Sequence, residues 1–127
     1  MKTKLLIAFC LLVSTTFAQT KTETVKNESN SVTLTENDKT YELSASYNAD
    51  LDKKIYDYMD DQISDGGVKF RNTRVDAQMT LDNKMSFYAK NSPGKLVLKL
   101  DKRKNSADIY KRFKSMCEGI RDIIQKK

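Results

Sequence analysis

The spacing of apolar residues switches three times along this sequence, and that switching constrains the fold more than any other feature. Apolar side chains alternate with polar ones from Val32 to Tyr47, and then follow a helical spacing from Leu51 to Ile63. They alternate again between Thr73 and Leu100, and return to a helical spacing from Ile109 to Ile124. A period of two predicts half-buried strands and a period near 3.6 predicts amphipathic helices. The expected order is therefore strands, helix, strands, helix.

The first strands and the first helix have recognisable boundaries. The turn-like run at 36–39 divides the first alternating stretch, which predicts a β-hairpin with one buried face. Asn48 and Asp50 are good N-cap residues for the helix that follows. Gly66 and Gly67 should end that helix, because glycine adopts the left-handed C-cap conformation at low cost.

The second half predicts a three-stranded meander and a C-terminal helix. Short turns at 82–84 and 92–95 separate its strands, and Pro93-Gly94 suits a type II turn. Asn105 with Asp108 resembles a capping box at the start of the last helix. We therefore expect an α+β fold, built as an antiparallel sheet of hairpin and meander with both helices packed on one face. The 127 residues suffice for one compact domain, which we place at 32–127.

The N-terminal residues predict export. A short positive start precedes an unbroken apolar run at 5–13, and a polar stretch then ends at Ala18. This order is typical of a secretory signal peptide and resembles the leaders of bacterial periplasmic or secreted proteins. The run is too short to cross a bilayer as a helix, which needs about 20 residues. We expect cleavage after Ala18, a flexible polar segment at 19–31, and a periplasmic or secreted mature protein without a transmembrane segment.

The cysteines fit this prediction. Cys10 lies inside the apolar run of the leader, so cleavage would leave Cys117 as the only cysteine. A single cysteine cannot form a disulfide within the chain, so the hydrophobic core must stabilise the fold without one. Cys117 shares the apolar stripe of the last helix with Phe113 and Ile120, which favours burial over a bridge to another chain.

The composition excludes several kinds of chemistry. The chain contains no histidine, which rules out Ser-His-Asp and Cys-His arrangements and histidine-ligated metal sites within it. The sequence also lacks a phosphate-binding loop, and the run 61–66 departs from a calcium loop at Ile63. We therefore assign no catalytic, cofactor-binding or metal-ligating residues and expect no cofactor.

Charge is distributed unevenly. Residues 95–127 hold 11 basic and 4 acidic side chains, whereas residues 19–94 hold 10 basic and 13 acidic ones. The basic side chains suit a solvated helix face, an anionic component of the cell envelope or another protein as the partner. Export and the lack of exposed aromatic runs argue against nucleic acid as the partner. The candidate patch for an anionic partner comprises Lys102, Arg103, Lys104, Lys111, Arg112 and Lys114.

Two functions remain open at this stage. The first is a small exported binding or interaction domain that catalyses no reaction. The alternative is a cell-envelope hydrolase that uses carboxylates of the first helix, such as Asp57 and Asp61. We see no internal repeat and no family signature in the mature sequence. The sequence favours a binding function only because it lacks the residues and motifs of common catalytic sites.

Overall fold

The structure, a computed structural model, describes residues 20–27 and 29–125, and the predicted signal peptide lies outside this part. The six strands are β1 (Lys21–Lys26), β2 (Ser31–Glu36), β3 (Thr40–Ser46), β4 (Asp76–Thr80), β5 (Ser86–Ser92) and β6 (Lys95–Asp101). The two α-helices are α2 (Asp52–Gln62) and α3 (Ala107–Gln125). Short 3₁₀ turns form η1 (Ala49–Leu51), η2 (Ser64–Gly66) and η3 (Lys102–Lys104).

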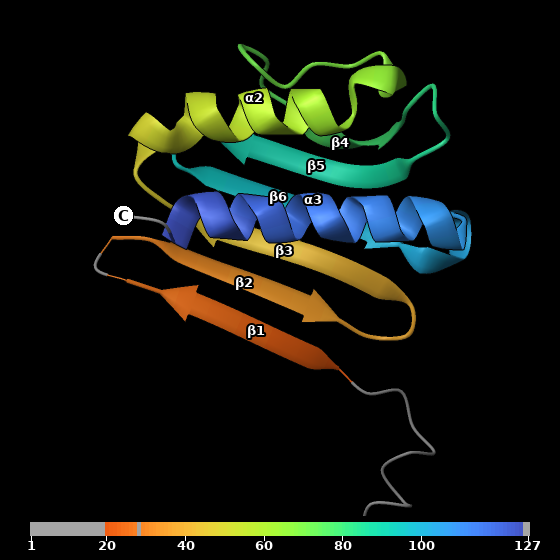
Figure 1. The fold of residues 1–127 in the computed structure, drawn as a ribbon, viewed down its shortest axis with the longest axis horizontal. Coiled ribbons are helices and arrows are strands. Elements are labelled where there is room, and N and C mark those ends of the chain that lie inside the picture. The colour runs from red at the N-terminus through yellow and green to blue at the C-terminus, as the bar shows by residue number, and fades with distance from the viewer. Residues whose placement is uncertain (1–19, 28, 126–127) are drawn as a thin grey trace, which may run out of the picture.

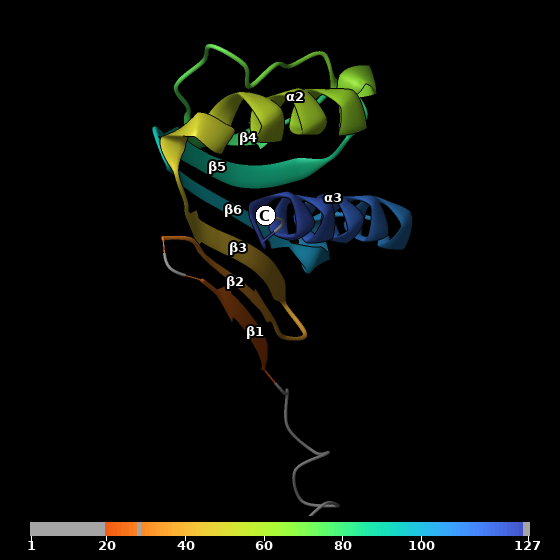
Figure 2. The same cartoon turned by 60° about the vertical axis from the view of Figure 1, so that its left-hand side comes forward.

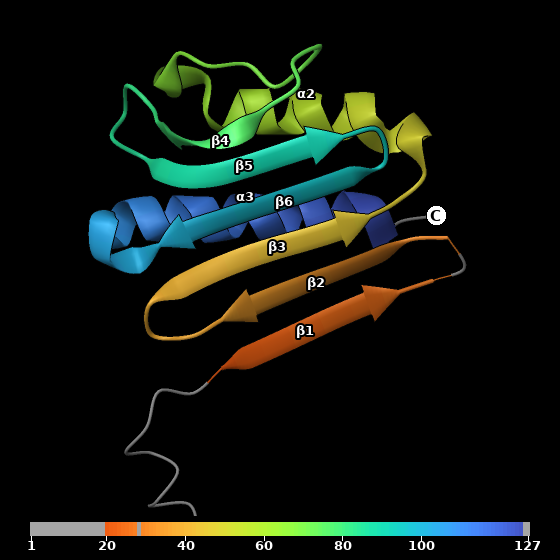
Figure 3. The same cartoon turned by 180° about the vertical axis from the view of Figure 1, so that it is seen from behind.

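All strands join one antiparallel sheet in the order β1-β2-β3-β6-β5-β4 (Figure 1). Both helices lie on the same face of this sheet, as the turned view shows (Figure 2). Seen from behind, the opposite face carries no helix (Figure 3). The predicted α+β fold, with its hairpin, helix, meander and C-terminal helix, is therefore confirmed.

The segment expected to be a flexible tether contains β1 instead. Lys21–Lys26 pairs with β2 along its whole length, from Lys21 opposite Glu36 to Lys26 opposite Ser31. An edge strand needs only one neighbour and little burial. β1 is therefore mostly polar and lacks the alternating apolar residues from which the other strands were predicted. The Arg121 guanidinium of α3 also reaches across to Glu23, 2.9 Å away, and fixes β1 to the helical layer.

The core lies between the sheet and the helices. It consists of alternate strand residues and the apolar stripes of α2 and α3, so the buried side chains follow the sequence pattern. Phe113 of α3 is fully buried against Phe87 of β5, with ring centroids 5.4 Å apart. Cys117 is a free, buried cysteine, as predicted.

The arrangement of elements repeats although the sequence does not. Three strands and a helix (β1-β2-β3-α2) are followed by three strands and a helix (β4-β5-β6-α3). The two units meet where β3 pairs with β6, with Leu43 opposite Leu98 at the centre of the sheet. The strand order 1-2-3-6-5-4 is therefore that of two similar units joined edge to edge.

The residues that cap η1 and α3 differ in how well the sequence predicted them. Asn48 caps η1, the 3₁₀ turn that leads into α2, by accepting a hydrogen bond from the Asp50 N–H, whereas α2 itself has no side-chain cap. The capping box at Asn105 is wrong, because the Ser106 hydroxyl accepts from the Ile109 N–H at the start of α3. Asn105 instead bridges Ser86 and Asp101 of two neighbouring strands, a role that depends on the tertiary fold.

Candidate functional site

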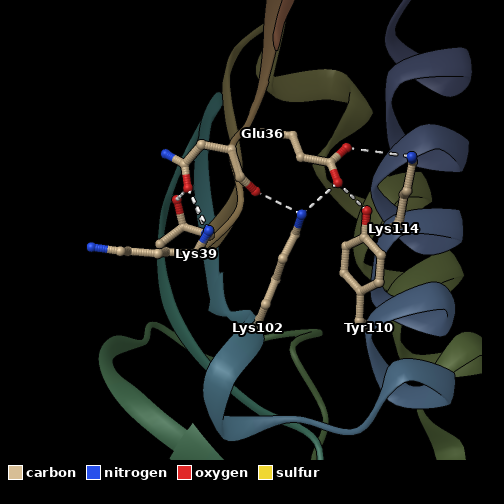
Figure 4. Close-up of polar contacts among 7 residues, drawn as sticks. Glu36, Lys39, Lys102, Tyr110 and Lys114 are labelled. Carbon is tan, nitrogen blue, oxygen red and sulfur yellow. Dashed lines mark hydrogen bonds and ion pairs between the residues drawn. The ribbon is translucent and has the colours of Figure 1, made fainter. Parts of the chain in front are cut away.

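The predicted basic patch divides into a paired part and an exposed part. Lys102 lies in η3 and Lys114 in the second turn of α3, and both ammonium groups point to the same carboxylate, Glu36 at the end of β2. Figure 4 shows this cluster, in which Tyr110 also donates its hydroxyl to Glu36. These two lysines therefore link the sheet to the helical layer.

Distances and burial show how firmly Glu36 is held. Lys102 Nζ lies 2.7 Å from Glu36 Oε2 and 2.6 Å from the Asn37 carbonyl, and Lys114 Nζ lies 3.4 Å from Glu36 Oε1. Partial burial would raise the pKa of Glu36, but the hydrogen bonds from Lys102 and Tyr110 and the two lysine charges lower it to about 2. Glu36 is therefore ionised at neutral pH and neutralises part of the patch.

The two arginines of the patch are also paired. Arg103 clamps Asp101 with both Nε and Nη2, and its hydrogen bonds lower the pKa of that carboxyl to about 2. Arg112 contacts Asp65 of η2 at 3.0 Å and the Gln62 carbonyl at the end of α2. Each arginine keeps more than a third of its side chain exposed.

Lys104 and Lys111 are the patch residues without an ion-pair partner among the described residues. The other four cations pair with three carboxylates, those of Glu36, Asp65 and Asp101. These ion pairs neutralise part of the positive charge, so the patch is weaker than the sequence count indicated. An anionic partner at this end stays a prediction.

The acidic face of α2 makes its own contacts, apart from η3. Asp57 pairs with Lys53 at 2.8 Å and with Arg71 at 3.4 Å, and these contacts lower its pKa. Asp60 accepts from the N–H groups of Phe70 and Arg71 and so fixes the loop after η2. Within residues 20–27 and 29–125, no three carboxylate or thiol side chains are grouped so that they could hold a metal ion.

A hollow of about 590 Å³ lies at the other end of the sheet, and sequence reasoning did not find it. Three segments meet there: η1 with the start of α2, the loop at 71–74, and the β5–β6 turn at 91–93. Its lining contains carboxylates, cations, amides and one aromatic ring. These polar lining residues include Asp50, Asp52, Tyr56, Arg71, Arg74 and Asn91.

Side-chain hydrogen bonds hold these segments in place. Asp52 accepts from the Gly94 N–H at 3.2 Å, which joins the first turn of α2 to the β5–β6 turn. Asn91, 4% exposed, accepts from the Val75 N–H at 2.6 Å and donates to the Thr73 carbonyl at 2.8 Å. Gly94 has a φ of +74°, and a Cβ there would lie 2.7 Å from the Tyr47 carbonyl, so this position requires glycine.

Tyr47 supplies an unusual feature near this hollow. Tyr47 is 5% exposed, and its buried hydroxyl lies beside the side chains of Tyr56 and Asp52. Burial raises the pKa of Tyr47, and Tyr56 and Asp52, which both line the hollow, raise it further.

One feature of the sequence, a polar residue in a buried strand register, could have indicated the hollow. Phe87, Ala89 and Asn91 occupy alternate positions of β5, so Asn91 puts an amide where the strand faces the core. A polar residue in a buried register needs specific partners. The sequence could not show those partners, because Thr73 and Val75 reach Asn91 only through the fold.

No protein-family model, curated protein or solved structure matches this chain. Among the described helices, none is long and apolar enough to cross a bilayer.

Proposed function

We propose that the mature chain acts outside the cytoplasm as a small binding domain that catalyses no reaction. The predicted signal peptide supports export, and the lack of histidine supports binding over the commonest acid-base chemistry. The intact mass of the protein from its native host tests the export step. A mass that retains residues 1–18 would contradict export by cleavage after Ala18. A mass that includes a lipid would contradict a mature chain that is soluble outside the cytoplasm.

We place the binding site in the hollow beside α2. The observation that carries this proposal is the convergence of polar side chains from three separate segments on one hollow, among them Asp50, Arg74 and Asn91. The volume of about 590 Å³ falls in the range of about 300–1,000 Å³ that small-molecule sites occupy. Accurately placed polar groups in such a hollow can fix the orientation of a ligand.

The charges around the hollow indicate the kind of ligand. The hollow is lined by three cations, Lys53, Arg71 and Arg74, and by two carboxylates, Asp50 and Asp52. Asp57 lies outside the lining but pairs with Lys53 and Arg71, so it supplies a third negative charge. Such a balanced set of donors and acceptors suits an uncharged ligand rich in hydroxyl groups, because each hydroxyl can both donate and accept. Sugar units of an envelope polysaccharide have this chemistry, and an exported protein would meet them.

Titration with neutral oligosaccharide fragments, followed by calorimetry and by NMR of the labelled protein, tests this site. We expect shifts confined to residues that line the hollow, and at least tenfold weaker binding in Arg74→Met and in Asp50→Asn. Arg103→Met is the matched control, because it removes an exposed guanidinium at the other end of β6 and should bind as the wild type does. Unshifted hollow residues at saturating fragment, or equal loss in the control, would contradict the proposal.

The hydrolase alternative is supported by two lining carboxylates, Asp50 and Asp52. These differ from Asp57 and Asp61, the residues that the sequence suggested. Asp57 suits a proton donor poorly, because it is ion-paired and its pKa is lowered. Turnover of peptidoglycan fragments that is lost in Asp52→Asn would favour the hydrolase. Unchanged fragments together with measurable binding would favour the binding domain.

A further inference from the structure

The free edge of β4 ends the sheet with unpaired backbone groups. In an antiparallel pair, the N–H and C=O of one residue point to the same side, and successive residues alternate between sides. Val75 and Leu81 both bond toward the β5 side, through Asn91 and Met85. The residues between them at even positions therefore direct their N–H and C=O groups away from the sheet. These residues are Asp76, Gln78 and Thr80.

The side chains of these three residues hold β4 extended. Tyr88 donates to Asp76 at 2.6 Å, Gln78 donates to Ser86 at 3.1 Å, and the Thr80 hydroxyl lies 3.2 Å from that of Ser86. No hydrogen bond from another described residue reaches the outward backbone groups of β4. The edge is therefore ordered before any partner arrives, which lowers the entropic cost of pairing.

The two edges of the sheet differ in how well they resist pairing. β1 carries three charged residues in six, and Arg121 of α3 reaches one of them. β4 carries one charged residue in five and contains neither lysine nor proline. Charged residues, lysine above all, and proline are the usual protection of an edge strand. In addition, Ala77 is exposed and Met79 is only partly buried on the face that the helices cover elsewhere.

We propose that two copies of this chain pair β4 to β4 antiparallel about a two-fold axis at Gln78. Gln78 would exchange both backbone bonds with its symmetry mate, and Asp76 would do so with Thr80 of the other copy. Ala77 would lie opposite Met79 of the other copy, which covers the exposed apolar atoms. No like charges meet in this register, and an isologous contact of this kind closes at two copies.

The expected product is one continuous sheet of twelve strands with all four α-helices on one face. A two-fold axis perpendicular to the sheet keeps both helical layers on the same side. Edge pairing of two similar units already occurs within the chain, where β3 meets β6. This inference is independent of the hollow, which lies at the end of the strands.

Sedimentation velocity over a range of concentrations tests the dimer in the mature wild-type protein. Gln78→Pro removes the central outward N–H, which the two-fold axis uses twice, and should shift the protein to monomer. Thr24→Pro is the matched control, because Thr24 is the central outward residue of the other edge strand, and it should leave the dimer intact. Circular dichroism checks that both variants remain folded.

Oxidative cross-linking supplies a second measurement that does not depend on weakening the fold. Gln78→Cys should form a dimeric disulfide rapidly, because its two-fold mate would lie about 5.5 Å away between Cα atoms, within disulfide range. Thr24→Cys should cross-link at least tenfold more slowly, and Cys117 is buried and should not react. A wild type that stays monomeric at all concentrations, or a dimer that only the Thr24 variants affect, would overturn the proposal.

Discussion

At the scale of single residues, Glu36 links three elements of the fold. It ends β2, yet its contacts reach η3 through Lys102 and α3 through Lys114 and Tyr110. Lys102 Nζ also lies 4.8 Å from the centroid of the Tyr110 ring. These groups keep one another charged and ordered, so the cluster contributes to stability in addition to its position in the basic patch.

This cluster predicts a specific pH dependence of stability. The pKa of Glu36 is about 2 in the fold and 4.5 without the fold, so folding favours the ionised form. Its contribution is complete above about pH 4.5 and is lost as pH falls through 2. Glu36→Gln should therefore cost up to about 3 kcal/mol of unfolding free energy at pH 7. The difference from wild type should shrink between pH 5 and pH 2 in urea titrations, and a difference that does not vary with pH would contradict this.

At the scale of elements, the packing of α2 on α3 depends on a glycine inside a helix. Gly119 lies in the middle of α3, where glycine costs about 1 kcal/mol relative to alanine. A Cβ at this position would overlap the hydroxyl and ring of Tyr58 from α2. Glycine at this position lowers the helix propensity of α3, but it allows Tyr58 of α2 to lie close to the α3 backbone.

The sign of one substitution should depend on Tyr58. Gly119→Ala should destabilise the wild-type protein, because Tyr58 must move from its place on α3. In a Tyr58→Ala background the same change should stabilise the protein by up to about 1 kcal/mol, since only the gain in helix propensity remains. Denaturant unfolding of all four proteins measures this coupling. The same effect of Gly119→Ala in both backgrounds would show that Tyr58 moves freely.

At the scale of the whole molecule, one helical layer must cover a six-stranded sheet. α3 supplies five fully buried side chains to this layer: Phe113, Met116, Cys117, Ile120 and Ile124. Complete burial of a large apolar side chain contributes about 1.5–3 kcal/mol. A domain of this size has about 5–15 kcal/mol in total. The C-terminal helix therefore carries a large share of the stability.

Truncation before Asn105 should consequently abolish cooperative unfolding. Removal of α3 would expose the apolar centre of the sheet, including Leu43 and Leu98, and α2 alone could not cover it. The milder change Phe113→Ala should cost about 3–5 kcal/mol and leave a cooperative transition. Thermal melts followed by circular dichroism measure both. A cooperative melt in the truncated protein would show that α3 is dispensable for the core.

The sequence by itself determined the two α-helices and every strand except β1. Local periodicity sets which side of a strand or helix is apolar, so the order of hairpin, helix, meander and helix could be predicted from spacing alone. Asn48 and the Pro93-Gly94 turn act within a few positions and were recognised from the sequence, whereas the capping box at Asn105 was wrong. The burial of Cys117 followed from its place on the stripe.

Only the tertiary structure decided which polar residues meet. Glu36 and Lys114 are 78 positions apart, and no local pattern could show that one neutralises the other. β1 was missed because an edge strand needs pairing more than apolar residues. The hollow was missed because its three walls come from separate segments. Apolar contacts need only the right face, whereas hydrogen bonds and ion pairs need particular partners, and those partners are chosen by the fold.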